Sequence, residues 1–326
     1  MRALSLSLIA LVLVVVSTKA LSGVVSENGL LSINTSKIVN SKGQPIALAG
    51  MSFFWSNSGW AGEAFYNQKT VDYLVADWGV TIIRAAMGID AEGGLVDDPE
   101  NLARLELLIH AAIKQDIYII VDFHSHHAED YLEHAKIIFD YLSKKYGHYP
   151  NIIYEIYNEP LKDTDWKSVI KPYAETIIPI IRKNDPDNII VVGTQAWSQE
   201  VDKAARLPLE GFSNIAYTLH FYAGTHHSEL RRKAQYAIDQ GLPLMVTEWG
   251  TVNATGDGAV DHKQTKRWLE FMQKNHLSHC NWSVSDKAEG ASIFKPNSAK
   301  KPSWSDADLT ESGTLVKQNI KNWQRY

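Results

Sequence analysis

Eight short apolar runs alternate with longer amphipathic stretches along this chain of 326 residues, and this rhythm limits the possible folds more than any other feature. Each run is apolar on both faces, as required of strands in a parallel sheet covered by helices. The runs span 46–52, 81–87, 118–124, 152–159, 189–194, 215–222, 244–249 and 279–285. Helical patterns occupy 67–78, 101–115, 129–146, 165–184, 228–240, 262–275 and 315–323. Eight strand–helix units predict a closed TIM (β/α)8 barrel of the α/β class rather than an open doubly wound sheet.

The segment 23–44 precedes the first barrel strand. It contains the turn dipeptides Asn28-Gly29 and Lys42-Gly43 between short apolar stretches, which predicts a short N-terminal β-hairpin. No Ser/Thr/Pro-rich linker separates the strand–helix units, and the units use up the chain. We therefore expect one domain over residues 21–326, without a linker or a second module.

The first twenty residues form a separate segment. Arg2 precedes an apolar run over 3–16, and small or polar residues follow it up to Ala20. This pattern is typical of a secretory signal peptide over 1–20, cleaved near Ala20. The run is shorter than the about 20 apolar residues that a membrane span needs, although an uncleaved anchor is the alternative. We expect a secreted, extracellular protein that has no membrane contact after cleavage.

Charge and cysteine content exclude two classes of protein. The 32 Lys and Arg balance 37 Asp and Glu, so no basic surface for nucleic acid is expected. Cys280 is the single cysteine, which rules out an intramolecular disulfide, and its apolar surroundings predict a buried side chain rather than a reactive thiol. Sequons at Asn34 and Asn253 lie in loop-like sequence and are candidates for N-glycosylation, whereas Asn281 lies in a predicted strand and is expected to be unmodified.

Polar residues gather at the carboxyl ends of the predicted strands, where a barrel of this kind carries its chemistry. They are Arg84, the runs Asp122-Phe123-His124, Asn158-Glu159-Pro160, His220-Phe221-Tyr222 and Thr247-Glu248-Trp249, and Trp282. An isolated Glu after a strand more often caps a helix or meets solvent. Two of them, Glu159 and Glu248, here face one opening together with Arg, His, Tyr and Trp. Paired carboxylates across a cleft are what glycosidic bond cleavage requires.

The order and spacing of Asn158-Glu159-Pro160, His220-Phe221-Tyr222 and Thr247-Glu248-Trp249-Gly250 closely resemble glycoside hydrolase family 5, in particular its bacterial-type endoglucanases (cellulases), close to subfamily 2. The likeness extends from Gly50 to Lys287. It implies a secreted cellulase, an endo-1,4-β-D-glucanase (EC 3.2.1.4), that hydrolyses internal bonds of cellulose or β-glucan with retention. We expect a monomer without cofactor or metal and, because the strand–helix units use up the chain, without a carbohydrate-binding module.

The resemblance assigns roles to the polar residues. Glu159 is expected to be the acid/base and Glu248 the nucleophile, with their carboxyl groups about 5 to 5.5 Å apart. Hydrogen bonds from Arg84 and Tyr222 should lower the pKa of Glu248, while Glu159 keeps its proton. Asn158 should bond the sugar 2-hydroxyl. His124 and His220 should hold sugar hydroxyls and the carboxylates.

Tryptophans should supply the sugar-binding surface. The resemblance places Trp282 beneath the sugar next to the cleaved bond, because a pyranose packs its apolar face on an indole. Trp55 or Trp60 would hold the next sugar outward, with Lys287 and Glu289 bonding its hydroxyls. Phe54 stands where many relatives carry His, which leaves one sugar contact open. The remaining helical tryptophans, Trp78, Trp166, Trp268 and Trp323, are expected to pack between helices.

Three other interpretations compete with this one. His124-Ser125-His126-His127 has the spacing of a metal site, but the later strand ends offer Glu159, Tyr222 and Glu248 instead of further His and Asp ligands. His126 and His127 are then expected to line the cleft or face solvent, and Glu155 to be a paired carboxylate inside the barrel. An inactive carbohydrate-binding barrel would usually have lost one carboxylate. The same chemistry could act on xyloglucan, mannan, xylan or mixed-linkage glucan, and the sequence leaves the preferred polymer, the pH optimum, the oligomeric state and the exact cleavage site open.

Overall fold

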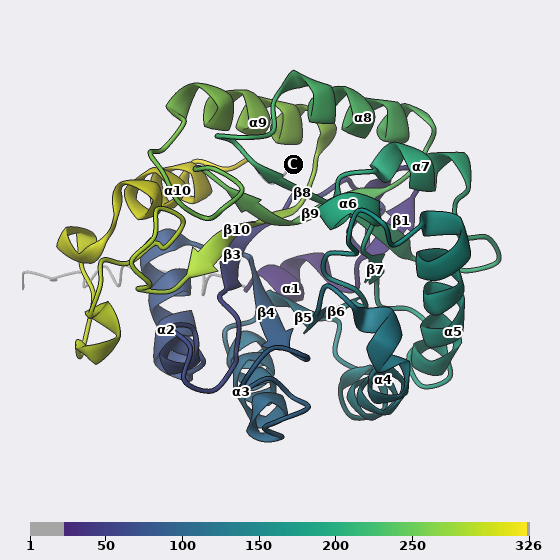
Figure 1. Ribbon diagram of the computed structural model, residues 1–326, viewed down its shortest axis with the longest axis horizontal. Helices are drawn as coiled ribbons and strands as arrows, with labels where there is room; N and C mark the ends of the chain where they lie inside the picture. Colours follow the sequence, from purple (N-terminus) through teal and green to yellow (C-terminus); the bar gives the residue numbers. More distant parts are fainter. Residues whose placement is uncertain (1–22, 325–326) are drawn as a thin grey trace, which may run out of the picture.

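The computed structural model describes residues 23–324, and within them eight parallel strands close into one barrel (Figure 1). The order around the barrel is β10-β3-β4-β5-β6-β7-β8-β9. Their bounds are Ala49–Phe53 (β3), Ile82–Gly88 (β4), Tyr118–His124 (β5), Ile152–Glu155 (β6), Ile190–Val192 (β7), Ile215–Tyr222 (β8), Leu244–Gly250 (β9) and His279–Val284 (β10). The predicted (β/α)8 barrel is confirmed. The predicted signal peptide lies outside the described residues.

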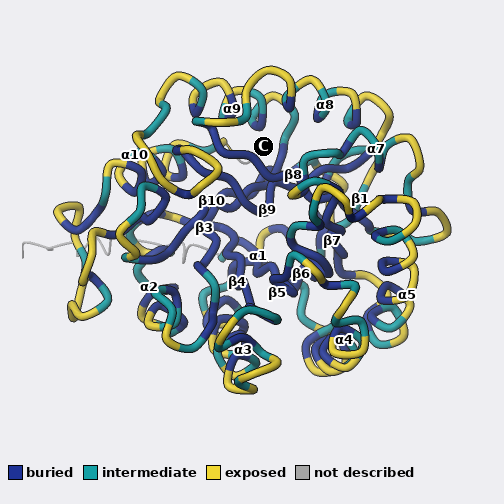
Figure 2. The backbone as a smooth tube through the Cα atoms, viewed as in Figure 1, coloured by how far each residue is buried: buried dark blue, intermediate teal, exposed yellow. Residues whose placement is uncertain are grey.

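Helices surround the barrel on its outer side (Figure 1). The helices α2 (Gln68–Tyr73), α3 (Glu100–Lys114), α4 (Leu132–Tyr146), α5 (Lys171–Arg182), α8 (Ser228–Asp239), α9 (His262–Asn275) and α10 (Glu311–Lys321) match the predicted helical stretches. In α3, Leu105, Leu108 and Ala112 are buried at the three-to-four-residue spacing of one helix face. Caps fix the ends: the Asp261 side chain accepts from the Gln264 backbone at the start of α9. Figure 2 shows the buried inner faces against the exposed outer ones.

Between β7 and β8 the chain forms two short elements that the sequence pattern does not predict. They are α6 (Gln195–Ser198) and α7 (Val201–Arg206). Elements of four and six residues are too short to show helical periodicity. In α6 the backbone of Ala196, Trp197 and Ser198 is left-handed, with φ of 59°, 56° and 57°. Three consecutive non-glycine residues in this conformation are costly, and tertiary contacts must hold them.

The N-terminal hairpin is present, but one of its predicted turns is wrong. Strands β1 (Ser32–Asn34) and β2 (Lys37–Val39) pair antiparallel. Asn28-Gly29, however, ends the helix α1 (Val24–Asn28) instead of joining two strands. Two valines of α1 pack into the core, which favours a helix there, and Gly29 at φ 68° ends it.

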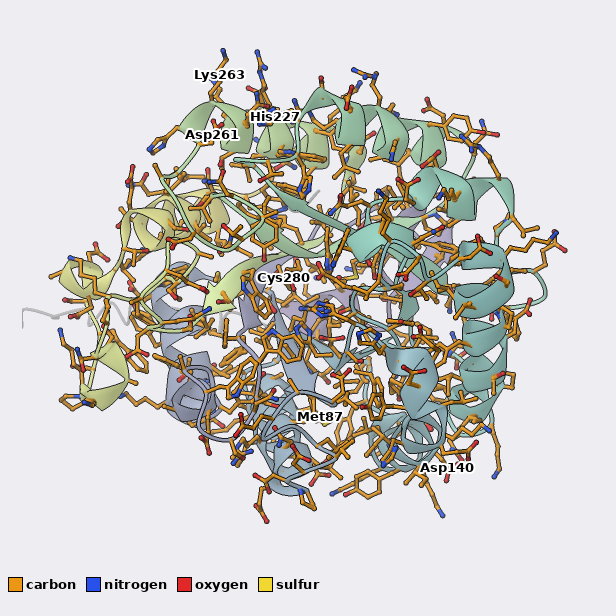
Figure 3. The ribbon with its side chains drawn as sticks, in the orientation of Figure 1. Met87, Asp140, His227, Asp261, Lys263 and Cys280 are labelled. Atoms are coloured by element: carbon orange, nitrogen blue, oxygen red, sulfur yellow. The ribbon has the colours of Figure 1, made fainter. Side chains whose placement is uncertain are left out.

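The helical tryptophans and the single cysteine have structural surroundings, as expected. Trp78, Trp166 and Trp268 are buried. Trp323 is partly buried and donates from its indole nitrogen to the Ala47 carbonyl. Cys280 lies on β10 among the barrel strands (Figure 3). Burial raises the pKa of its thiol, so the protonated, unreactive form dominates.

The three sequons differ in exposure. Asn34 and Asn253 are exposed, so the prediction that they accept glycans stands untested. Asn281 is fully buried on β10 and donates its side-chain amide to the Trp249 carbonyl, so no glycan can reach it in the folded chain.

Across residues 23–324, no helix has both the length and the apolar character that crossing a membrane would require.

Candidate active site

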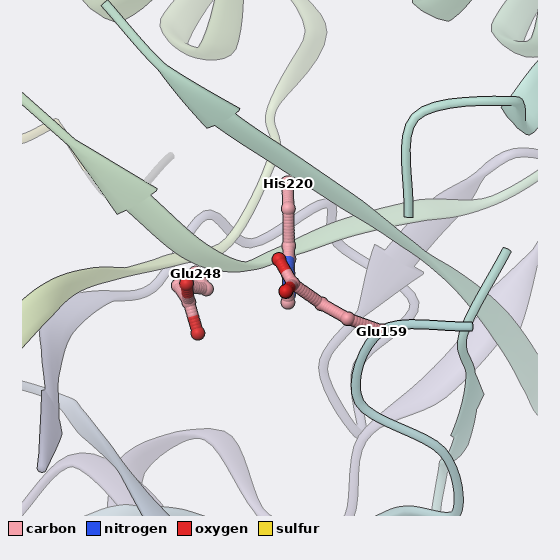
Figure 4. Close-up of side chains that lie close together, drawn as sticks. All are labelled: Glu159, His220 and Glu248. Carbon is pink, nitrogen blue, oxygen red and sulfur yellow. The ribbon is translucent and has the colours of Figure 1, made fainter. Parts of the chain in front are cut away.

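Two glutamates and a histidine meet at the carboxyl ends of the barrel strands (Figure 4). Glu248 lies on β9, His220 lies on the neighbouring β8, and Glu159 follows β6. One carboxylate oxygen from each glutamate and one ring nitrogen of His220 all lie within 4.8 Å of one another. One oxygen of Glu159 and one oxygen of Glu248 are therefore no more than 4.8 Å apart.

Arg84 on β4 forms the charged floor beneath this pair. Its guanidinium is completely buried and lies 2.6 Å from Glu155, 2.9 Å from Asp122 and 3.1 Å from Glu248. It also donates to Asn158 Oδ1 at 2.7 Å. One permanent cation thus compensates three buried carboxylates and holds side chains from β5, β6 with the loop after it, and β9. Glu155 is paired inside the barrel, as expected.

Glu248 accepts hydrogen bonds from Arg84 and from the phenol of Tyr222, the latter at 2.8 Å. These are the two partners that the sequence predicts. The predicted direction of the pKa shift, however, is wrong for the free site. Burial and the nearby charge of Glu159 raise the pKa of Glu248 to about 8, even though Arg84 and Tyr222 act in the opposite direction.

Glu159 lies between two imidazoles. His220 Nδ1 is 2.9 Å from Oε1, and His126 Nε2 is 3.1 Å from Oε2. Burial opposes the charge of Glu159, yet these two partners hold its pKa well below the usual range. In the free site Glu159 therefore favours its ionised form, contrary to the expectation that it keeps its proton. The sequence gives no warning of this, because the contact with His126 depends on the path of a loop.

His124 and Trp282 form one wall of the site. The ring of His124 bonds Asp122 through Nδ1 at 2.6 Å and stacks on Trp282, with centroids 5.4 Å apart and planes at 8°. Burial, with Arg84 nearby, lowers the pKa of His124, so its ring is neutral. Burial raises the pKa of Asp122 to about 7 although Arg84 opposes the shift. The stack presents a flat aromatic face beside the carboxylates.

The cleft has two lobes that share Glu159, Tyr222, Glu248 and Ala254. The Trp282 lobe, about 320 Å³, also includes Phe54, Trp55, Trp60, His124, His126, Asn158, Lys287 and Glu289. The Trp197 lobe, about 350 Å³, also includes Trp197, Gln199, His220 and His226. The two carboxylates therefore lie at the junction, with room on both sides.

The residues that the sequence predicts for the sugar-binding surface, Trp55, Trp60, Trp282, Lys287 and Glu289, all lie in the Trp282 lobe, whereas His220 lines the Trp197 lobe. Phe54 packs on Trp282 with ring centroids 5.3 Å apart, and Trp55 packs on Trp60 at 5.6 Å. Lys287 pairs with Glu289 at 2.5 Å and lies 5.3 Å above the Phe54 ring. Phe54 thus makes this part of the lobe apolar where a His would be polar.

Sequence reasoning missed Trp197, Gln199 and His226 in the Trp197 lobe, and the role of His126 as a partner of Glu159. Trp197 is 41% exposed, and its backbone N–H donates to the Pro160 carbonyl at 2.8 Å. Ser198 Oγ donates to the Asn158 carbonyl at 2.8 Å. These bonds tie the left-handed turn to the loop that carries Glu159. A Trp directly after the strand 189–194 is the signal that could have indicated it.

The cluster of Glu159, His220 and Glu248 is compact enough for a metal ion, but its atoms are already committed to other partners. His220 Nε2 bonds Thr247, His220 Nδ1 bonds Glu159, and Glu248 bonds Arg84 and Tyr222. The second and third His of His124-Ser125-His126-His127 point elsewhere: His126 bonds Glu159, and His127 is exposed. We assign no metal or cofactor to the described residues.

A parallel barrel with two carboxylates opposed in an open cleft defines a glycoside hydrolase architecture. Comparison with known proteins gives the same result. A family model, Cellulase (glycosyl hydrolase family 5), matches residues 39–288. Endoglucanase Z of Dickeya dadantii is 50% identical over 294 residues, which cover 90% of this chain and 66% of that protein. Endoglucanase A of Evansella cellulosilytica is 43% identical over 283 residues, covering 86% of this chain and 57% of the relative.

Solved structures agree with the sequence relatives. The catalytic domain of Thermobifida fusca endoglucanase Cel5A superposes with a TM-score of 0.87 at 31% identity, covering 92% of this chain and 100% of that domain. A Cytophaga hutchinsonii protein gives a TM-score of 0.88 at 45% identity, covering 92% of this chain and 97% of the other. The chain belongs to the cellulase family, glycosyl hydrolase family 5. It spans about two thirds, or less, of the length of the two endoglucanases compared above.

Proposed function

We propose that the protein is an endo-β-1,4-glucanase that cleaves internal bonds of cellulose or β-glucan with retention of configuration. The observation that carries this proposal is the approach of Glu159 and Glu248 to within 4.8 Å. Retaining enzymes hold their carboxyl groups about 5 to 5.5 Å apart, whereas inverting enzymes leave about 6.5 to 9.5 Å for a water molecule. The relatives named endoglucanases support the activity.

In this proposal Glu248 attacks the anomeric carbon while Glu159 protonates the departing glycosidic oxygen. The bond to the leaving chain breaks as a covalent glycosyl ester forms on Glu248. A water then attacks that carbon, gives its proton to Glu159 and releases Glu248. In the free site the proton needed for the first step lies in the hydrogen bonds between Glu159 and its two imidazoles, from which it can move to Glu159 without entering solvent.

The lobes of the cleft supply the binding sites. Asn158 Nδ2 is buried, lines the Trp282 lobe and has no partner among the described residues, so it is free to donate to a sugar 2-hydroxyl. Trp282 forms the floor beneath this sugar, beside His124. Trp55, Trp60, Lys287 and Glu289 would hold the next sugar, while the Trp197 lobe would hold the leaving chain. Space on both sides of the carboxylates suits cleavage within a polymer.

We also propose, from the pattern of residues 1–20, that the enzyme is exported, and that it acts outside the cell as a monomer on a polysaccharide. No cofactor enters the proposed chemistry.

The decisive experiment measures reducing ends released from carboxymethylcellulose, mixed-linkage glucan, xyloglucan, mannan and xylan. We expect highest activity on carboxymethylcellulose, with a rapid fall in viscosity, and loss of at least about 10³-fold in Glu159→Gln and Glu248→Gln. Proton NMR of early products should show the retained β-anomer. Preference for another polymer would correct the substrate and keep the chemistry. Binding without any products would identify an inactive barrel, and unchanged activity in both variants would refute the assignment of the site.

A further inference from the structure

A buried chain of hydrogen bonds leads from Glu155 to the proposed acid/base. Glu155 Oε1 accepts from Thr247 Oγ1 at 2.6 Å, Thr247 Oγ1 lies 2.8 Å from His220 Nε2, and His220 Nδ1 lies 2.9 Å from Glu159 Oε1. Glu155, Thr247 and His220 are at most 1% exposed. We propose that Glu155 is a positioning residue that acts through Thr247 to fix which nitrogen of His220 carries hydrogen, and thereby keeps a proton available to Glu159. This inference rests on the proposed role of Glu159.

Burial raises the pKa of Glu155, but its hydrogen-bond partners act against this shift and favour the ionised form. Arg84 Nε, which always carries hydrogen, donates to Oε2 at 2.6 Å. Two hydroxyls, those of Thr218 and Thr247, donate to Oε1 at 3.1 and 2.6 Å. A carboxylate is an acceptor for all three donors. The single hydrogen of the Thr247 hydroxyl is then committed to Glu155.

Hydrogen counting along the chain gives the consequence. Because Thr247 has already donated its one hydrogen, its oxygen can only accept from His220, so Nε2 must carry hydrogen. In the neutral ring Nδ1 is then a bare acceptor that faces Glu159. A carboxylate without a proton would repel this lone pair at 2.9 Å, so one proton must lie in the contact between Nδ1 and Oε1. Glu155 therefore secures a proton in the contact that Glu159 uses as an acid.

The charged groups around the chain come from several strands. Arg84 on β4 and Asp122 on β5 face Glu155 and His220 from one side, and Cys280 on β10 lies near Glu155. Glu159 is also faced by His126, by His226 beyond β8, and by Glu248 on β9. Among the described residues, none of these groups is hydrogen-bonded to Nε2 of His220, and Glu155 Oε1 itself lies 3.9 Å from that nitrogen, too far for a hydrogen bond, whereas Thr247 Oγ1 is at 2.8 Å. Thr247 is thus the route by which the interior of the barrel acts on this ring.

The two threonines on Glu155 offer a matched pair of variants. Thr247→Val removes the hydroxyl that reaches His220, whereas Thr218→Val removes a hydroxyl from the same carboxylate oxygen and leaves His220 untouched. In Thr247→Val, hydrogen should move to Nδ1, facing an ionised Glu159. Glu155→Gln should have the same effect. Arg84 Nε donates to the amide oxygen of the new side chain, so the amide NH2 faces Thr247. The Thr247 hydroxyl then accepts from this NH2 and donates its own hydrogen to His220 Nε2.

Nitrogen-15 NMR of the imidazole of His220 in the intact protein tests the first step. We expect Nε2 to carry hydrogen in the wild type and in Thr218→Val, in addition to the proton that Nδ1 shares with Glu159, and we expect Nε2 to lose its hydrogen in Thr247→Val and Glu155→Gln. Nε2–H in all four proteins would overturn the proposal. This measurement is independent of catalysis, so it does not depend on whether Glu159 is the acid.

Leaving-group dependence tests the second step. Thr247→Val should lower kcat/KM on cellotetraose by about 10²-fold, part of the about 10²- to 10⁴-fold that general acid catalysis provides. The 2,4-dinitrophenolate of 2,4-dinitrophenyl cellobioside leaves without protonation, so kcat/KM of Thr247→Val on this substrate should fall by less than about 3-fold. On cellotetraose, the basic limb of the pH profile should move to lower pH by about one unit. A tautomer change with equal losses on both substrates would uphold the control of His220 and overturn the acid role of Glu159. If Thr218→Val and Thr247→Val gave the same His220 tautomer and the same kcat/KM values, Thr247 would have only a packing role and the inference would be overturned.

Discussion

The phenol of Tyr222 on β8 reaches across to the adjacent strand and donates a 2.8 Å hydrogen bond to Glu248 Oε1. This bond favours the ionised carboxylate and lowers the pKa of Glu248 against the effect of burial. Removing it should both weaken the nucleophile's position and raise its pKa further.

Tyr222→Phe is therefore expected to lower kcat/KM on cellotetraose by about 10- to 100-fold, as for loss of a hydrogen bond of about 1.5 to 3 kcal/mol to a charged group. The acidic limb of the pH profile should move to higher pH, because a higher pKa leaves Glu248 protonated over a wider range. An unchanged limb alongside reduced activity would mean that Tyr222 acts only on the sugar.

Glu159→Gln should shift the titration of Glu248 in the opposite direction. The charge of Glu159 is one of the causes that raise the pKa of Glu248 to about 8, so its removal should lower that value. The measurement is the pH dependence of inactivation by 2,4-dinitrophenyl 2-deoxy-2-fluoro-cellobioside, which needs no acid. We expect the acidic limb to move down in Glu159→Gln, and a limb at the wild-type position would show that the two carboxylates do not interact.

Arg84→Met should destabilise the fold in a pH-dependent manner. It leaves three buried carboxylates without their cation, so we expect a loss of about 3 to 5 kcal/mol in the free energy of unfolding at pH 7. Without Arg84 the pKa values of Asp122 and Glu155 rise further above those of the unfolded chain. Their destabilising effect grows as pH rises and is relieved as pH falls through the folded-state values. Urea unfolding at pH 7 and pH 5 should therefore show a smaller loss at pH 5.

Arg104→Met is the matched control for this experiment. Arg104 pairs with Glu63 and Asp98, which are partly exposed, so its loss should cost less than about 1 kcal/mol with little dependence on pH. Equal losses in the two variants would contradict the special role of the buried network.

Trp197→Ala should weaken binding on the leaving-group side without affecting stability. The side chain is 41% exposed and lines the Trp197 lobe. We expect KM for cellotetraose to rise about 5- to 10-fold, equivalent to about 1 to 1.4 kcal/mol of lost packing. Hydrolysis of an aryl cellobioside with a small aglycone should change little. Leu207→Ala, at a similarly exposed apolar residue outside both lobes, serves as control, and a parallel loss there would contradict the assignment.

Expression in a host that glycosylates exported proteins should modify Asn34 and Asn253 and leave Asn281 bare. The first two are exposed, whereas Asn281 bonds the Trp249 carbonyl inside the barrel. Mass spectrometry of tryptic glycopeptides measures this directly. A glycan on Asn281 would require modification before folding.

Local sequence predicts the barrel well because each strand carries its own apolar run and each helix its own periodicity. The runs 118–124 and 215–222 coincide with β5 and β8. The strand ends also predict which side chains converge, since parallel strands present their carboxyl ends at one face. Glu159 and Glu248 are therefore found without a structure.

What sequence cannot predict depends on contacts between distant segments. The left-handed turn Ala196–Ser198 has no local signal, because hydrogen bonds to Pro160, Leu161 and Asn158 impose it. The protonation pattern fails for the same reason: His126 reaches Glu159 only through the path of its loop. Pairwise charge effects depend on distances of a few ångströms, and the sequence contains no distances.

Closure of the barrel between β10 and β3 joins segments from opposite ends of the chain. The backbone N–H of Leu48 bonds the Ser278 hydroxyl, 230 positions further along, and Trp282 on β10 pairs in register with Ser52 on β3. Contacts of such long sequence separation form slowly. Residues up to and beyond Trp282 must therefore be synthesised before the Trp282 side chain can pack beside the site residues of the earlier strands. The cleft is therefore the last part of the molecule to be assembled, and a partly synthesised chain has no complete sugar-binding surface.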